Sequence, residues 1–165
     1  MGNPETDLCR SLTNVPYSST LLFIRVPLQE RFMTSVYKLL LLNQMVAVCR
    51  LPAMAAFPEW AQGEDLVALV RTPEEVTIVC SEQFVPPGVE AEPGWRAVQV
   101  EGSLDFNQVG VLAALAAPLA EAAVSIFVVS TFSTDFILVK AGQLDQALEA
   151  LQQAGHMVLS GIERG

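Results

Sequence analysis

Residues 95–160 read WRAVQV EGSLDFNQVG VLAALAAPLA EAAVSIFVVS TFSTDFILVK AGQLDQALEA LQQAGHMVLS. Their hydrophobic pattern predicts six elements in the order strand, helix, strand, strand, helix, strand. The predicted strands cover residues 95–100, 124–129, 135–140 and 157–159, and the run 124–129 is apolar enough to suit a central strand. This order is that of a ferredoxin-like βαββαβ unit, which is an α+β arrangement with helices on one face of a sheet.

Both predicted helices have an apolar face and recognisable ends. Asp105 or Asn107 is expected to cap the first helix, and Pro118 is expected to kink it. Gly155 stands where the second helix would end in a left-handed residue. Apolar residues recur at helical spacing in the two segments: Val111, Leu112, Leu115 and Leu119, then Leu144, Ala147, Leu148 and Leu151.

The preceding half of the chain is rich in short strand patterns. β-favouring runs cover residues 37–42, 45–50, 66–72 and 76–81. The segment Thr72-Pro-Glu-Glu75 predicts a hairpin turn between the last two runs. Only a short helical turn, at 57–61, fits between the proline and glycine residues that follow the second run. This half therefore reads as a degenerate α/β unit.

Three parts are expected along the chain. Residues 1–34 show no sustained period and are interpreted as a poorly ordered extension; translation beginning at Met33 is an alternative to Met1. Residues 35–92 form the degenerate N-terminal unit. Two Pro/Gly clusters between Pro86 and Gly94 predict a linker. Residues 93–162 form the second unit.

Composition excludes several classes of function. The 165 residues carry a net charge of -9, which argues against binding nucleic acid or anionic membrane surfaces. Apolar runs fall short of the roughly 20 residues of a membrane helix, and Glu5 and Asp7 stand where a signal peptide needs basic residues. The cysteines Cys9, Cys49 and Cys80 are too few and too widely spaced for a disulfide framework. A cytoplasmic protein is expected.

The sequence offers little catalytic chemistry. The single histidine, His156, follows a predicted helix beside Gly155 and is interpreted as a capping or surface residue. Cys80 lies in an apolar strand pattern, where a buried thiol is expected. No nucleophile and base, metal-ligand cluster or phosphate-binding glycine motif is present. We expect no catalytic residues, no metal and no cofactor.

A ligand-binding geometry is predicted where the turn 104–110 runs into the first helix. The free N–H groups and the dipole of a helix N-terminus favour a carboxylate, and Gly110 lets a ligand approach the backbone. Thr131 and Asp135 lie at a neighbouring strand junction, where Asp135 is able to pair with an ammonium or guanidinium group. Alternatively, Gly110 serves only helix packing and Asp135 only closes a hairpin.

Two segments resemble the ACT-domain regulatory modules, in particular the small tandem-ACT proteins related to the CASTOR cytosolic arginine sensors. They are LDFNQVGV at 104–111 and STFSTDFILV at 130–139, and the resemblance extends over 36–160. It implies tandem ACT units, the first degenerate, that bind an amino acid at an ACT–ACT interface without catalysis. Matched by position, the binding loop is Val109, Gly110 and Val111, with Gln108 beside it where the arginine sensors are acidic. Thr131, Phe132 and Asp135 would line the opposite side.

Two hypotheses follow from this reading. The first is a regulatory amino-acid sensor whose ligand alters the association of ACT units and the behaviour of a partner protein. A homodimer is expected, because the truncated first unit needs a second copy to complete the pocket. The second is a constitutive interaction or dimerisation module that binds no ligand. A small enzyme ranks last.

Overall fold

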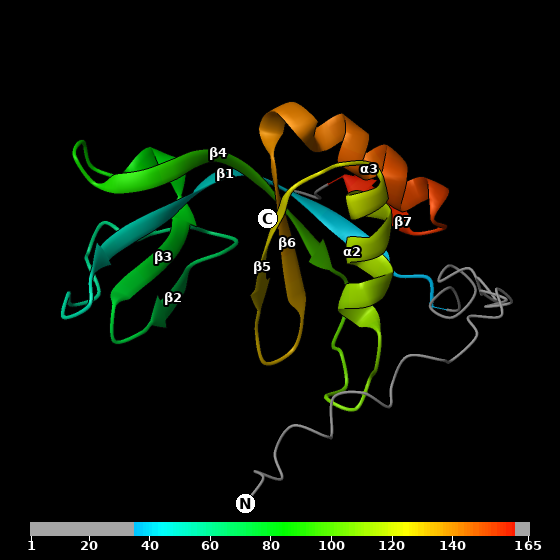
Figure 1. The fold of residues 1–165 in the computed structure, drawn as a ribbon, viewed down its shortest axis with the longest axis horizontal. Coiled ribbons are helices and arrows are strands. Elements are labelled where there is room, and N and C mark those ends of the chain that lie inside the picture. The colour runs from blue at the N-terminus through cyan, green and yellow to red at the C-terminus, as the bar shows by residue number, and fades with distance from the viewer. Residues whose placement is uncertain (1–34, 161–165) are drawn as a thin grey trace, which may run out of the picture.

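Strands dominate residues 35–160, the part of the chain that the computed structural model describes (Figure 1). Two 3₁₀ helices, η1 (Glu82–Phe84) and η2 (Ala141–Gln143), join longer elements. The α-helices are α2 (Val111–Glu121) and α3 (Leu144–Gln153). The strands are β1 (Lys38–Pro52), β2 (Ala68–Arg71), β3 (Glu75–Ser81), β4 (Glu90–Val100), β5 (Ile126–Ser130), β6 (Asp135–Lys140) and β7 (Met157–Ser160).

All of these strands belong to one sheet, in the order β2-β3-β1-β4-β6-β5, with β7 paired to β1. β1 is antiparallel to β4 along most of its length. Its first residues, Lys38 to Leu41, also pair in parallel with β7, and Val46 to Pro52 pair with β3. β1 therefore lies between β4 and β7 and joins the strands of the two predicted units.

The α-helices lie side by side on one face of this sheet (Figure 1). Leu115 and Leu119 of α2 and Leu151 of α3 are fully buried against the sheet residues Leu39 and Ile137. The predicted α+β class with helices on one face is confirmed. Neither α2 nor α3 is long and apolar enough to cross a bilayer, and residues 35–160 contain no other helix that is.

The other face of the sheet is buried as well, because the sheet curls. Phe136 and Leu138 of β6 pack with Trp95 of β4 and with Leu66 and Val79 from the N-terminal half. Residues of β6 alternate between this cluster and the helix-covered one, so the strand is buried on both sides. The central strand is thus β6. The prediction of a central strand at 124–129 is wrong, since β5 lies at the sheet edge.

Two local predictions in the N-terminal half also need correction. The runs 37–42 and 45–50 form one strand, β1, in which the pairing shifts register between Leu41 and Met45. The segment 57–61 is no helix; a single bond from the Ala61 N–H to the Pro58 carbonyl closes a turn. The predicted extension 1–34 lies outside the described residues.

The predicted linker is only partly a loop, because β4 begins at Glu90 and runs through Pro93 and Gly94. The pairing with β1 shifts register at this point, where Val46 opposes Trp95 and Val48 opposes Glu92. A bulge tolerates a proline that has no N–H to donate and a glycine with positive φ, here +78°. The strand therefore continues through residues that ordinarily end one.

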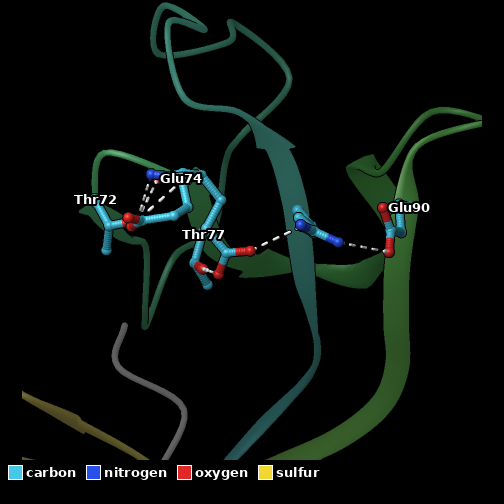
Figure 2. A network of polar contacts seen from close by, with 6 residues as sticks. Thr72, Glu74, Thr77 and Glu90 are labelled. Carbon is cyan, nitrogen blue, oxygen red and sulfur yellow. Dashed lines mark hydrogen bonds and ion pairs between the residues drawn. The ribbon is translucent and has the colours of Figure 1, made fainter.

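Polar contacts hold the predicted β2–β3 hairpin turn (Figure 2). The N–H groups of Glu74 and Glu75 donate to Thr72 Oγ1 over 3.2 and 3.1 Å. Arg50 on β1 forms ion pairs with Glu75 (2.8 Å) and Glu90 (3.6 Å) on the flanking strands. These side chains are largely exposed, so each ion pair contributes about 1 kcal/mol or less. The hairpin prediction is confirmed.

Two cysteines lie in a third buried cluster with Val76 and Ile78, on β1 and β3. Cys49 and Cys80 are 1% and 0% exposed, which confirms the prediction of a buried Cys80. Burial raises the pKa of both thiols, and that of Cys80 rises to about 12. Both side chains are therefore neutral thiols at physiological pH.

We expect Leu115→Ala to lower the free energy of unfolding by about 2 to 5 kcal/mol, because it leaves a cavity between α2 and the sheet. Leu112→Ala on the same helix is the matched control. Its side chain is 40% exposed, so a loss of about 1 kcal/mol or less is expected. Urea unfolding followed by circular dichroism measures both changes. Equal losses would contradict the assigned core.

In a Cys9→Ser background, Cys49 and Cys80 are expected to react far more slowly with Ellman's reagent at pH 8 than free cysteine does. Their raised pKa keeps the thiolate population low, and burial restricts access. Both should react fully in urea. A thiol in the folded protein that reacts at the rate of free cysteine would contradict the buried pair.

Candidate ligand-binding site

A hollow of about 410 Å³ lies at the N-terminus of α2, next to the turn between β5 and β6. We call it the loop pocket. Val109, one of the predicted site residues, is 91% exposed and does not line it. The other predicted residues come together in its lining: Gln108, Gly110, Val111, Thr131, Phe132 and Asp135.

The start of α2 presents unused backbone donors to this pocket. Gly110 is the N-cap residue, with φ +90°, and its carbonyl accepts the first helical bond from Ala114. No side chain caps the helix, so the N–H groups of Val111, Leu112 and Ala113 have no partner within the helix. All three residues line the loop pocket. The positive end of the helix dipole thus faces the hollow.

The predicted caps, Asp105 and Asn107, are wrong. Asp105 Oδ1 instead accepts hydrogen bonds from the N–H (2.8 Å) and Nδ2 (3.0 Å) of Asn107, within the loop itself. Glycine takes the cap position because the chain enters α2 in a left-handed conformation that other residues rarely adopt. Among residues 35–160, the N–H donors of the helix start therefore have no hydrogen-bond partner.

Asp135 provides negative charge in the same pocket. It is the first residue of β6, pairs through its backbone with Ser130, and is only 9% exposed. Among residues 35–160, no hydrogen bond or ion pair to its carboxylate is found, and the basic side chains bind elsewhere. The carboxylate oxygens keep contact with solvent in the hollow, because they are not among the fully buried side-chain atoms that lack a partner. An ammonium group in the pocket would therefore be able to pair with them.

The turn that carries Thr131 and Phe132 is held tightly. Thr131 Oγ1 donates to the Thr134 carbonyl (2.8 Å) and accepts from its N–H (3.1 Å). Thr134 Oγ1 donates to the carbonyl of Val100 on β4 (2.6 Å), and the Leu104 N–H donates to the Ser133 carbonyl (2.7 Å). These bonds fix both walls of the pocket before any ligand binds.

A tyrosine far away in the sequence supports the binding loop. Gln108 Nε2 donates to the Tyr37 hydroxyl (3.3 Å), and the Tyr37 N–H donates to His156 Nδ1 (3.3 Å). The other ring nitrogen of His156 lies 3.2 Å from the Ala114 carbonyl. His156 is 6% exposed, so its prediction as a surface residue is wrong, whereas the capping role is confirmed: its backbone N–H donates to the Leu151 carbonyl (3.0 Å) at the end of α3. It joins β7, the start of β1 and α2.

Several lining residues lie outside the predicted set. Some of them lie in the turns that the sequence predicted to form the site. Leu112 does not; its hydrophobic spacing predicted that it lies on the buried face of its helix. Nothing in the sequence signals the contact of Tyr37, which stands 71 positions before Gln108. The added lining residues are Leu104, Asp105, Phe106, Leu112, Ala113, Ser130, Ser133 and Thr134.

A second hollow of about 800 Å³ lies between α2 and α3. Alanines make up most of its lining, and both ring nitrogens of His156, which also lines it, already have partners. This larger hollow lacks the paired charges of the loop pocket. Among residues 35–160, no group of three or more His, Cys, Asp or Glu side chains is placed to hold a metal ion.

Comparisons with known proteins indicate which family this part of the chain resembles. The family model described as the ACT domain matches residues 90–153, which include the loop pocket. A second model, described as an N-terminal domain, matches residues 44–88. The cytosolic arginine sensor for mTORC1 subunit 1 of Homo sapiens is 38% identical over 60 residues. That match covers 36% of this chain and 18% of the relative, so this chain spans about a fifth of its length.

Solved structures extend the likeness to most of the chain. A protein of Agrobacterium tumefaciens is 34% identical, with a TM-score of 0.74 over 80% of this chain and 98% of that one. Escherichia coli aspartokinase III, solved with aspartate and ADP, is 13% identical with a TM-score of 0.52, over 70% of this chain and 32% of that one. The latter likeness shows the fold alone. The chain is an ACT-domain protein of the tandem ferredoxin-like type, related to the CASTOR arginine sensors.

Proposed function

We propose that the protein is a non-catalytic amino-acid sensor whose ligand binds in the loop pocket. One observation carries the proposal: the unpaired carboxylate of Asp135 and the open N–H groups of α2 line the same hollow. A free amino acid carries an ammonium group and a carboxylate on one carbon. The pocket offers a partner of opposite charge to each.

Binding would proceed without chemical change. The ligand carboxylate accepts hydrogen bonds from the N–H groups at 111–113, and its ammonium group donates to Asp135. Thr131 and Gly110 also line the pocket. Each ligand group that leaves water then gains a charged or dipolar partner, so desolvation is offset.

ACT-domain membership and the relatives' description as arginine sensors support a regulatory rather than a catalytic role. We propose that the N-terminal unit (35–92) and the C-terminal unit (93–162) act together, and that the loop pocket lies where a second ACT unit approaches. Ligand binding would shift the association of units and thereby a partner protein. The relatives are named cytosolic sensors, which supports a cytoplasmic location for this protein.

The first test is Asp135→Asn, which keeps the shape of the side chain and removes its charge. We expect amino-acid affinity to fall by about tenfold to a hundredfold, the range for a lost charge-assisted hydrogen bond. A thermal-shift screen of the twenty L-amino acids selects the probe, because a ligand of the native state raises apparent stability. Isothermal titration calorimetry then measures its affinity.

The matched control is Asp145→Asn, an exposed change on α3 outside the loop pocket. It should leave affinity unchanged. Equal affinity of the wild type and Asp135→Asn for the amino acid would show that the charge of Asp135 does not contribute to binding. A screen in which no amino acid stabilises the wild type would contradict the sensor.

The alternative, a constitutive dimerisation module, rests on the edge strand β5. Its residues, Ile126–Ser130, carry no charge, and its outer edge has no strand partner among the described residues. Such an edge is able to pair with a strand of another chain. Ser130 also lines the loop pocket, so a second copy paired along β5 would lie beside the ligand.

We therefore expect a homodimer whose population rises when amino acid saturates the pocket, measured by sedimentation velocity over a concentration series. Ile126→Lys should favour the monomer, because a charge on an edge strand opposes pairing. Val70→Lys, on the opposite edge strand β2, should not. A monomer at every concentration would contradict the dimer, and a dimer with no ligand response would favour the alternative.

A further inference from the structure

Two exposed phenyl rings meet at the mouth of the loop pocket. Phe106 is 77% exposed and Phe132 is 82% exposed, and they come from the two loops that form the pocket walls. Their ring centroids lie 5.0 Å apart at an interplanar angle of 78°, an edge-to-face contact. Large apolar side chains gain free energy when an apolar surface covers them. This aromatic pair is therefore a surface on which an apolar group is able to pack.

The loops hold the rings in place before a ligand arrives. The bond from the Leu104 N–H to the Ser133 carbonyl joins the two walls two residues from Phe106 and one from Phe132. Leu112, 40% exposed at the start of α2, lines the pocket beside them. The apolar wall thus adjoins the helix start that would hold the ligand carboxylate.

Two of the polar side chains near these rings already have hydrogen-bond partners. Asp105 accepts two hydrogen bonds from Asn107, and the Gln108 amide donates to the Tyr37 hydroxyl. Asp105 is exposed, so water competes with a cationic side chain of the ligand for Oδ2, the carboxylate oxygen to which Asn107 does not donate. Asp105 and Asp135 are the charged groups of the lining, so an acidic side chain would meet only like charge.

We propose that the loop pocket selects an amino acid with an uncharged apolar side chain, aliphatic or aromatic, which packs on Phe106, Phe132 and Leu112. This inference rests on the proposed function, because it presumes that the backbone end of the ligand is held by α2 and Asp135. It adds the class of ligand. The aromatic pair would contact the side chain of the ligand. The helix start and Asp135 would bind the carboxylate and ammonium groups that all amino acids share.

The experiment is calorimetric titration of the full-length protein with individual amino acids. L-Leucine, L-methionine and L-phenylalanine probe the apolar wall, and L-alanine reports the backbone contacts alone. L-Arginine and L-glutamate probe the two charges. At least one apolar probe should bind about tenfold tighter than alanine, as the burial of a small hydrocarbon side chain predicts. Arginine and glutamate should bind no tighter than alanine.

Phe106→Ala and Phe132→Ala should each weaken the apolar probe severalfold and leave alanine affinity unchanged. Both rings are exposed, so the variants are expected to fold. Phe57→Ala is the control, since Phe57 is 52% exposed and lies outside the pocket lining. Sedimentation velocity of the variants shows whether the rings instead contact a second copy.

The possible results distinguish the proposed ligand class from the proposed sensor function. If arginine or glutamate binds tightest, the apolar class is wrong and the amino-acid sensor stands. If the phenylalanine variants change sedimentation but not affinity, the rings belong to a protein contact and the inference falls. If no probe binds, alanine included, the proposed function fails and the inference fails with it.

Discussion

The pairing of β1 with three other strands is the constraint on which the rest of the molecule depends. β1 bonds to β4 on one side, and to β7 and β3 on the other. Leu39, near its start, is fully buried beneath the helices, whereas Val46 lies in the cluster on the opposite face. One strand thus fixes the register of both halves. The C-terminal unit is completed by a strand that precedes it in the chain, inserted between the first and last strands of its own βαββαβ pattern.

This sheet also determines where the charges of the loop pocket lie. β6 is buried on both faces, so its first residue, Asp135, is held in a rigid position at the end of a central strand. α2 packs through Leu115 on the same sheet, and Gly110 turns the chain into its first turn. The carboxylate and the helix start are therefore placed independently of any ligand. Preorganisation of this kind reduces the entropy lost on binding.

Sequence reasoning predicted the order of the elements and the two loops of the site, because hydrophobic period and turn residues are local signals. The predictions were wrong where contacts between distant parts of the chain, such as strand pairing, determine the structure. The register shift that lets β4 pass through Pro93 and Gly94 depends on β1, a partner about 45 residues away. The same holds for the edge position of β5, for the burial of His156, and for Tyr37 behind Gln108. Such contacts have no local signature.

In the proposed complex, the start of α2 holds an amino-acid carboxylate. The most direct measurement is the ¹⁵N–¹H NMR spectrum during titration with the tightest-binding amino acid, and separately with the amine that lacks its carboxylate. We expect the amide signals of Val111, Leu112 and Ala113 to shift with the amino acid until saturation and to remain unchanged with the amine. Equal shifts with both compounds, or shifts confined to residues distant from the loop pocket, would contradict it.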